Sequence, residues 1–259
     1  MAKRSRAWNK AVYERYLKEG RGQGEGSSYC PWISVHDFSS RGTISRVAGH
    51  KTGRIHHFLS RNELNYFFLL EWSNQVLDIR EQYPLEDIAF AADIARCAGI
   101  LYPRDNVSGF PYVLTCDFMI TTTEGLQART IKSTTDLCNP RTIEKLEIER
   151  RYWIHKGIDW RIVTEREIPL QKCQNIEWLY TSAIIPSELA AYKYEKLRLI
   201  DKGVPLAHLA KYFDEWQRLS PGSGMRLLKH LILTREITCD METDLPALLM
   251  GNNTRKVAA

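Results

Sequence analysis

The stretch YVLTCDFMITTTEGLQARTIKS, residues 112–133, does most to determine the fold of this 259-residue chain. Its first part, Tyr112 to Thr121, is apolar and rich in strand-forming residues, as expected of a buried β-strand. A turn at Glu124-Gly125 follows, and Gln127 to Ser133 resumes a strand pattern. The stretch therefore predicts an antiparallel hairpin at the centre of a sheet.

Two charged residues, Asp117 and Lys132, interrupt the strands of this hairpin. A carboxylate inside an apolar strand is costly unless it is paired or bound to a metal. The turn between the strands would bring Asp117 and Lys132 close together. Their spacing leaves two interpretations open: a structural ion pair, or part of a catalytic centre.

The elements around the hairpin predict an α/β core with a mixed sheet. Asn139-Pro140 is a typical helix start, with Asn as the cap and Pro at the first helical position. Residues 86–111, which contain Pro103, Gly109 and Pro111, are expected to be loop. The other predicted elements are a helix over residues 5–19, a helix over 60–73, a strand over 76–82, a helix over 139–156 and a strand over 160–164.

Glu63 also has two interpretations. Ser60 and Glu63 fit a capping box, in which the Glu side chain bonds back to the N-cap backbone. A Glu at the start of a buried helix can also face the sheet, close to Asp117. Two converging carboxylates repel each other, and a divalent cation is the usual way to hold them together. Glu63, Asp117 and Lys132 are therefore a candidate hydrolytic metal centre.

The chain becomes helical after residue 180. Helices are predicted over residues 187–202, 205–219 and 223–233, followed by a short strand within 235–241. This pattern predicts a small winged-helix-like domain over residues 181–259, after a first domain over residues 1–180. The second of these helices carries both Lys211 and Asp214, and such mixed charge favours protein contact over base reading.

Basic residues are concentrated near the N-terminus. The chain has 36 Lys and Arg against 31 Asp and Glu, a net +5 that does not by itself indicate nucleic-acid binding. Residues 41–57, RGTISRVAGHKTGRIHH, form a predicted β-hairpin. Its expected DNA contacts are Arg46, His50, Lys51, Arg54 and His56. An ordinary charged edge hairpin is an equally good interpretation.

Other features argue against several alternative functions. The six cysteines show no metal-ligand spacing, and reduced thiols in a cytoplasmic protein are favoured over a disulfide framework. No apolar run is long enough to span a membrane. The glycine-dense loop over residues 20–26 is expected to be a flexible connector rather than a phosphate loop. Glu149 could be a metal-side acid, but a solvated helix face is the favoured interpretation.

Six longer strings, and the shorter EW at 71–72, identify a family. They are GRGQGEGSSYCPW (20–32), HKTGRIHHFLS (50–60), VLDIREQYPL (76–85), CDF (116–118), RTIEKLEIERRYW (141–153) and NIEWLY (175–180). In these segments the chain resembles the TnsA family, the endonuclease subunits of heteromeric transposases in Tn7-type transposons. The resemblance covers about residues 10–180 and is weaker beyond 185.

This resemblance implies a restriction-endonuclease-like fold and DNA cleavage that depends on Mg²⁺ or, in its place, Mn²⁺. The family's two catalytic carboxylates match Glu63 and Asp117, and its lysine matches Lys132. The position two before the lysine is usually Glu, Asp or Gln in this superfamily, and here it is Thr130. The role of that side chain is therefore expected to pass to a water molecule or to the Ile131 carbonyl, which makes Ile131 a candidate metal ligand.

The resemblance further implies cleavage at the 5′ ends of a transposon during cut-and-paste transposition. Double-stranded DNA, a TnsB-like transposase and a TnsC-like ATP-dependent regulator are the expected partners. The expected location is the bacterial cytoplasm, in association with the nucleoid. Two alternatives remain open: a stand-alone repair or junction nuclease of the same fold, and a non-catalytic assembly subunit bound to DNA.

Overall fold

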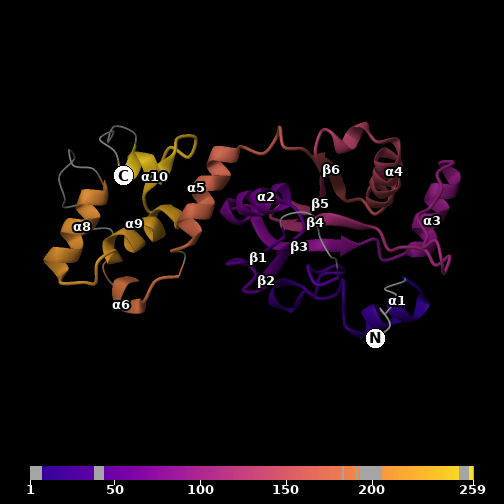
Figure 1. Cartoon of the computed structure of the whole chain (residues 1–259), viewed down its shortest axis with the longest axis horizontal. Coiled ribbons are helices and arrows are strands. Elements are labelled where there is room, and N and C mark those ends of the chain that lie inside the picture. The colour runs from indigo at the N-terminus through magenta and orange to yellow at the C-terminus, as the bar shows by residue number, and fades with distance from the viewer. Residues whose placement is uncertain are drawn as a thin grey trace, which may run out of the picture. The chain divides into compact units, whose positions relative to one another are not determined.

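The computed structural model describes residues 8–37, 44–182, 184–190, 192, 206–250 and 257–258. The chain divides into two compact units, unit 1 (Met1–Ile168) and unit 2 (Pro169–Ala259), and each is described by itself (Figure 1). The division lies between Ile168 and Pro169 rather than near residue 180.

Unit 1 is built on a four-stranded mixed sheet in the order β3-β4-β5-β6. The strands are β3 (Val76–Pro84), β4 (Thr115–Thr122), β5 (Gly125–Ile131) and β6 (Asp159–Val163). Strand β4 pairs antiparallel with β3 and with β5, whereas β6 runs parallel to β5. The predicted central hairpin is confirmed, with Phe118 opposite Arg129 and Thr122 opposite Gly125.

Helices cover both faces of this sheet. Those of unit 1 are α1 (Lys10–Lys18), α2 (Arg61–Trp72), α3 (Ile88–Cys97) and α4 (Pro140–His155), with short 3₁₀ turns at Gly26–Ser28 and Asp136–Cys138. Phe118 of β4 contacts the ring of Tyr66 in α2. Its neighbour Met119 packs instead in a core with Ile148 and Tyr152 of α4. Because successive strand residues point to opposite faces, α2 and α4 lie on opposite sides of the sheet.

The caps predicted for α2 and α4 are present. The Ser60 hydroxyl accepts a hydrogen bond from the Glu63 backbone at 3.2 Å. The Asn139 side chain accepts one from the Arg141 backbone at 2.9 Å, and Pro140 is the first helical residue. These caps satisfy N–H groups that have no partner within the helix, and so fix where both helices begin.

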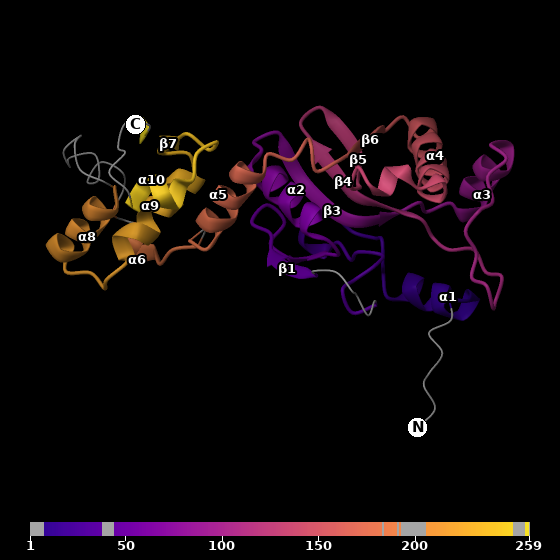
Figure 2. The same ribbon diagram turned by 45° about the horizontal axis from the view of Figure 1, so that its top comes forward.

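The basic hairpin is also confirmed. Strands β1 (Ser45–Ala48) and β2 (Ile55–Phe58) pair antiparallel, with Arg46 opposite His57. The hairpin packs beside β3 through β2 (Figure 2).

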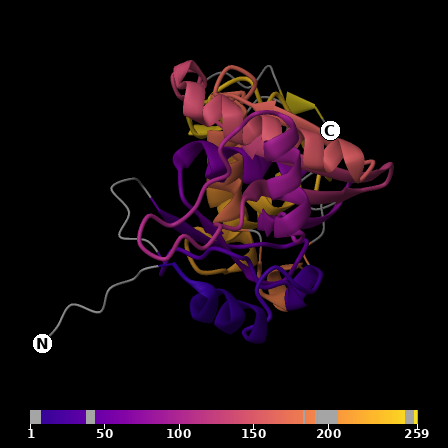
Figure 3. The same cartoon turned by 90° about the vertical axis from the view of Figure 1, so that its right-hand side faces the viewer.

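Helix α3 was not expected. It begins at an N-cap formed by Asp87, whose carboxylate accepts a hydrogen bond from the Phe90 backbone at 2.9 Å. Ala91 and Ala95, one turn apart, are buried, and α3 packs against α4 (Figure 3). The predicted loop over residues 86–111 is therefore wrong in its first half. The proline and glycine residues on which it rested all follow the helix.

The glycine-dense loop is tightly held rather than a flexible connector. Gly22 donates to the Cys30 carbonyl at 2.6 Å, and Cys30 donates to the Gln23 carbonyl at 3.0 Å. Gly22 has φ +76°, and a Cβ at this position would lie 2.5 Å from the Pro84 side chain. The loop thus packs on the end of β3, where only glycine fits.

Unit 2 is mainly helical. Its elements are α5 (Leu170–Tyr180), α6 (Ser187–Ala190), α8 (Leu206–Gln217), α9 (Ser223–Leu233), α10 (Leu245–Met250), β7 (Thr238–Cys239) and β8 (Val257–Ala258). Helix α5 packs against α9 and α10, which places it in unit 2. Most of the predicted helix 187–202 lies outside the described residues. No helix within the described parts of the chain is long and apolar enough to cross a membrane.

Candidate active site

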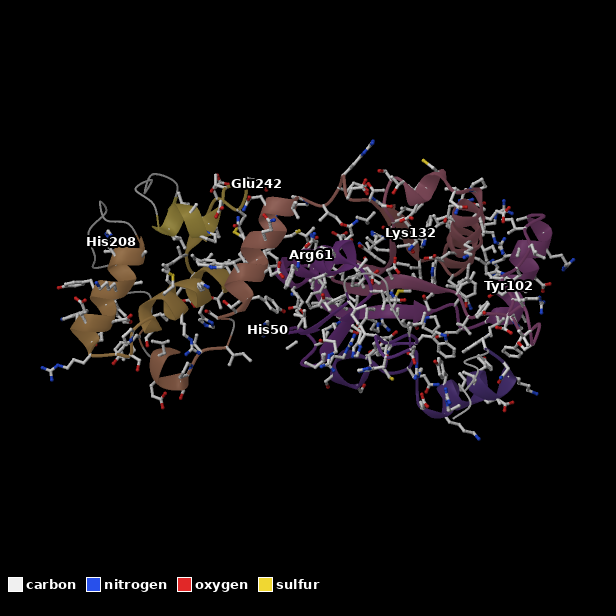
Figure 4. All side chains as sticks on the ribbon, viewed as in Figure 1. His50, Arg61, Tyr102, Lys132, His208 and Glu242 are labelled. Carbon is white, nitrogen blue, oxygen red and sulfur yellow. The ribbon has the colours of Figure 1, made fainter. Side chains whose placement is uncertain are left out.

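Asp117 and Lys132 meet as the hairpin predicts. Lys132, labelled in Figure 4, directly follows β5, and its ammonium lies 3.2 Å from Asp117 Oδ2. The same carboxylate oxygen accepts a hydrogen bond from the Ile131 backbone at 2.6 Å. Asp117 is buried, and these two donors hold its carboxylate in one orientation.

Glu63 caps its helix and faces Asp117 at the same time. Its carboxylate accepts hydrogen bonds from the Ser60 hydroxyl at 2.8 Å and from the Leu59 backbone at 3.0 Å. The Gln82 amide nitrogen lies 3.5 Å from Glu63 Oε2 and 3.3 Å from Asp117 Oδ1. The capping box and the convergence of carboxylates are therefore both present.

Gln82 is a site residue that the sequence did not indicate. Its amide oxygen accepts a hydrogen bond from the Thr115 hydroxyl at 3.2 Å, which turns the amide nitrogen toward the two carboxylates. The Gln82 backbone has φ +49°, a left-handed conformation that is uncommon for a residue other than glycine. A hint in the sequence is the run of three polar residues, Arg80 to Gln82, within the strand-like segment 76–84.

Electrostatic repulsion marks the centre of the site. Burial, followed by the nearby Asp117 carboxylate, raises the pKa of Glu63 to about 7. Burial alone would lower the pKa of Lys132, but the surrounding carboxylates, Asp117 first, raise it above its ordinary value. Lys132 therefore stays charged, while the Asp117 carboxylate disfavours the ionised form of Glu63.

Glu149 was expected on a solvated helix face, and this expectation is wrong. Glu149 is buried and accepts hydrogen bonds from the Thr130 hydroxyl and, at 2.8 Å, from the Trp160 indole. Burial raises the pKa of Glu149 to about 7. The exposed pair on this helix is instead Glu147 with Arg151, at 2.6 Å. Thr130 thus directs its hydroxyl to a carboxylate on the next helix.

A cavity of about 520 Å³ opens onto these groups. Ligand sites commonly have volumes of this order. The charged lining residues are Glu63, Lys132, Asp136, Lys145 and Glu149. Uncharged polar lining residues are Ser60, Asn62, Thr115, Thr130, Ser133 and Thr142. The cavity therefore brings together Glu63 at the start of α2, Ile131 and Lys132 at the end of β5, and Glu149 of α4, and Asp117 lies behind this lining, bonded to Lys132.

The donors present suit a hard divalent cation. Glu63, Asp117 and the Ile131 carbonyl supply oxygens, the atoms that Mg²⁺ prefers. Burial and the nearby Asp117 carboxylate raise the pKa of Glu63, and a cation bound here would favour its ionised form. Within the described residues no group of three His, Cys, Asp or Glu side chains is arranged to hold a metal, and the Ile131 carbonyl remains the candidate third donor. That carbonyl now accepts a hydrogen bond from Lys132 at 2.9 Å.

Two of the five predicted DNA contacts are not placed to touch DNA. Arg54 and His56 both bind the carboxylate of Glu81 in a buried network, His56 Nδ1 at 2.8 Å. His56 is fully buried, and its other ring nitrogen lies 2.7 Å from the Thr52 hydroxyl. The interpretation of these two residues as DNA contacts is therefore wrong, because their side chains are bound to a buried acid.

The other three predicted contacts lie nearer the surface. Arg46 and His50 are exposed and Lys51 is partly exposed. The Lys51 backbone donates a hydrogen bond to Glu71 at 3.3 Å. Arg46, His50 and Lys51 remain predicted DNA contacts.

Comparison with known proteins decides the family. The model of the TnsA-like endonuclease N terminal matches residues 73–165, and that of the TnsA endonuclease C terminal matches residues 167–241. The Tn7 transposition protein TnsA of Escherichia coli is 41% identical over 212 residues, which cover 81% of this chain and 74% of that protein. The chain belongs to the TnsA family.

Membership of the TnsA family makes this chain a transposon-cutting endonuclease. The mixed sheet with its flanking helices is the restriction-endonuclease-like core of a TnsA protein, and unit 2 is its helical C-terminal part. The N-terminal match contains Asp117, Lys132 and Glu149, whereas Glu63 precedes it.

Proposed function

We propose that this chain hydrolyses the DNA strand at the 5′ ends of a transposon with the help of Mg²⁺ or, in its place, Mn²⁺. The observation that supports this most directly is the convergence of Glu63 and Asp117 beside Lys132 at the cavity. A cation bound between the two carboxylates would relieve the repulsion that helps to raise the pKa of Glu63.

Glu63, Asp117 and the Ile131 carbonyl would hold the cation. A bound Mg²⁺ would neutralise charge on the scissile phosphate and lower the pKa of water at the site. Asp117 keeps the Lys132 ammonium at the cavity, where it can donate a hydrogen bond to the phosphate as negative charge develops. Thr130 binds Glu149 and so contributes to the shape of the cavity rather than to the donor set.

The proposed partners follow from the family. The relative in Escherichia coli is a transposition protein of transposon Tn7. We propose that a TnsB-like transposase cuts the 3′ ends and that unit 2 docks a TnsC-like ATP-dependent regulator. Double-stranded DNA of the transposon ends is the proposed substrate.

The decisive experiment is a strand-specific end-cleavage assay with the partner transposase and Mg²⁺ or Mn²⁺. We expect Asp117→Ala to reduce 5′-end cutting by about 100-fold or more, because charge stabilisation at the phosphate is lost. Asp93→Ala, at an exposed carboxylate on α3, is the matched control and should cut normally. Unchanged 5′ cutting by Asp117→Ala would refute the proposed centre. Robust cutting of plain or branched DNA without the transposase would instead favour a stand-alone nuclease.

A further inference from the structure

Helix α4 carries one basic side chain at the cavity that is not paired with an acid. Arg141 lies 2.5 Å from Glu144, and Arg150 and Arg151 both bind Glu147. Lys145 is exposed, and in the part of the chain that the structure describes it has no carboxylate within 4.0 Å. Lys145 nevertheless lines the cavity.

The acids nearest along the helix and across the cavity are already engaged. Glu149, one turn after Lys145, is bound by Thr130 and Trp160 beneath the helix. Asp136 accepts hydrogen bonds from the Ser133 backbone at 3.3 Å and from its hydroxyl at 2.6 Å. Both acids therefore have hydrogen-bond partners other than Lys145, although all three line the same cavity.

Lys132, the other cation in the lining, has its own partners. Its ammonium bonds to Asp117 and to the Ile131 carbonyl. Lys132 therefore belongs to the centre with Asp117. Lys145 instead lies on α4, which lines the cavity with Lys145 and the Thr142 hydroxyl. Asn62, at the start of α2, supplies a side-chain amide to the same lining. Ammonium, hydroxyl and amide groups are the usual donors to DNA phosphates.

We propose that Lys145 binds a backbone phosphate of the cleaved strand next to the scissile phosphate, and so positions that strand over the carboxylates. This inference rests on the proposed function, since it takes DNA as the occupant of the cavity. A cation on α4 also offsets the repulsion between the phosphates and the acids of the centre. Lys145 is thus a substrate-positioning residue rather than part of the cation-binding centre.

The test uses the full chain and a duplex of the transposon end, in EDTA so that no cutting occurs. One phosphate contact contributes a slope of about 0.9 in log K against log salt, or roughly 3.5-fold in affinity between about 50 and 200 mM. We expect the slope for Lys145→Ala to be shallower than that of wild type by about 0.9, and the slope for Lys145→Arg to equal that of wild type. Lys156→Ala, at an exposed lysine at the end of α4, is the matched control and should keep the wild-type slope. A wild-type slope for Lys145→Ala would overturn the inference.

A second measurement locates the phosphate. Single neutral methylphosphonate linkages are placed at successive positions around the cut site, and affinity is measured for wild type and for Lys145→Ala. The wild type should lose affinity at a linkage adjacent to the scissile one, and Lys145→Ala should be insensitive to that same linkage. Equal losses in both proteins would contradict the inference.

Failure of this inference can be distinguished from failure of the proposed function. If Asp117→Ala cuts like wild type, the proposed centre is refuted whatever the salt slopes are. If Asp117→Ala is inactive but Lys145→Ala binds and cuts like wild type, only the role of Lys145 is refuted. Urea denaturation of each variant, with an unchanged free energy of unfolding, shows that an effect of Lys145→Ala is local.

Discussion

Gln82 carries the main backbone irregularity of the site. Its φ of +49° puts a long side chain in a conformation that costs about 1–2 kcal/mol for an L-residue. Its carbonyl accepts a hydrogen bond from the Trp32 backbone at 3.3 Å, and its side chain is held by Thr115 and the two carboxylates. The surrounding contacts therefore maintain a strained conformation at the place where Glu63 and Asp117 meet.

The strain at Gln82 predicts that glycine is more stable than alanine at this position, which is the opposite of the usual order in strands. Within a strand, glycine is normally less stable than alanine. At position 82, Gln82→Gly should be more stable than Gln82→Ala by about 1 kcal/mol, because only glycine adopts positive φ without penalty. Urea denaturation of the two variants measures the difference. Both variants lack the amide, so a higher stability of Gln82→Ala would show that the left-handed backbone is not maintained in solution.

The residues of the site were only partly predictable. Asp117 and Lys132 were conspicuous because they are charges in apolar strands, and Glu63 because it fits a cap. Gln82 and Glu149 gave no such signal, since an amide or an acid on a partly polar element is common. Whether Glu149 faces solvent depends on Thr130 and Trp160, which approach it only in the folded sheet.

At the scale of elements, the β1–β2 hairpin was predictable, but the roles of its basic residues were not. Strand alternation and a glycine turn are local signals. The partner of Arg54 and His56 is Glu81, more than 20 residues further along the chain. Burial alone would raise the pKa of Glu81, but hydrogen bonds from Arg54 and His56 lower it to about 2. No local pattern reveals such a pairing.

The two hairpin arginines should therefore respond differently to substitution. Arg54→Ala leaves Glu81 buried without its main partner and should lower the free energy of unfolding by about 3–5 kcal/mol at pH 7. Arg46→Ala, at an exposed position, should change it by less than about 0.5 kcal/mol. Urea denaturation provides both values. Equal effects would show that Arg54 is not part of a buried network.

The pH dependence provides a further check on the same network. Because the pKa of Glu81 is lowered from 4.5 to about 2 in the folded protein, its stabilising contribution is complete above about pH 4.5. That contribution is lost as the pH falls toward 2. The difference in stability between wild type and Arg54→Ala should therefore shrink between pH 5 and pH 2 in the same denaturation experiments. A difference that is constant with pH would contradict this assignment.

Helices α2 and α4 were predicted closely, whereas α3 and α5 were missed. The first pair has Ser60 and Asn139 as caps at the expected places. Helix α5 begins at Leu170, and its N-cap residue, Pro169, makes no side-chain cap, so no local signal marks its start. It is stabilised by packing of Cys173, Ile176 and Leu179, which are buried in unit 2. Tertiary contacts of this kind cannot be recognised from a local pattern.

At the scale of the whole molecule, every proposed cation donor lies in unit 1. Units with separate cores are expected to unfold in separate steps. We expect calorimetry to show two unfolding transitions. Mg²⁺ should raise the midpoint temperature of the unit 1 transition alone, because ligand binding stabilises the unit that holds the site. Asp117→Ala should abolish this shift. A single transition that moves as a whole, or a shift that persists in Asp117→Ala, would contradict the assignment.

The sheet also suggests an order of assembly during folding. Lys132 and Asp117 are only 15 residues apart and meet across one tight turn, whereas Gln82 reaches Asp117 across 35 residues. Loop closure is faster and less costly for the shorter span. The ion pair should therefore form early, before Glu63 arrives on its helix. Glu63 then approaches an Asp117 carboxylate that is already paired with the Lys132 ammonium. Repulsion between Glu63 and Asp117 would therefore slow only the last steps of folding.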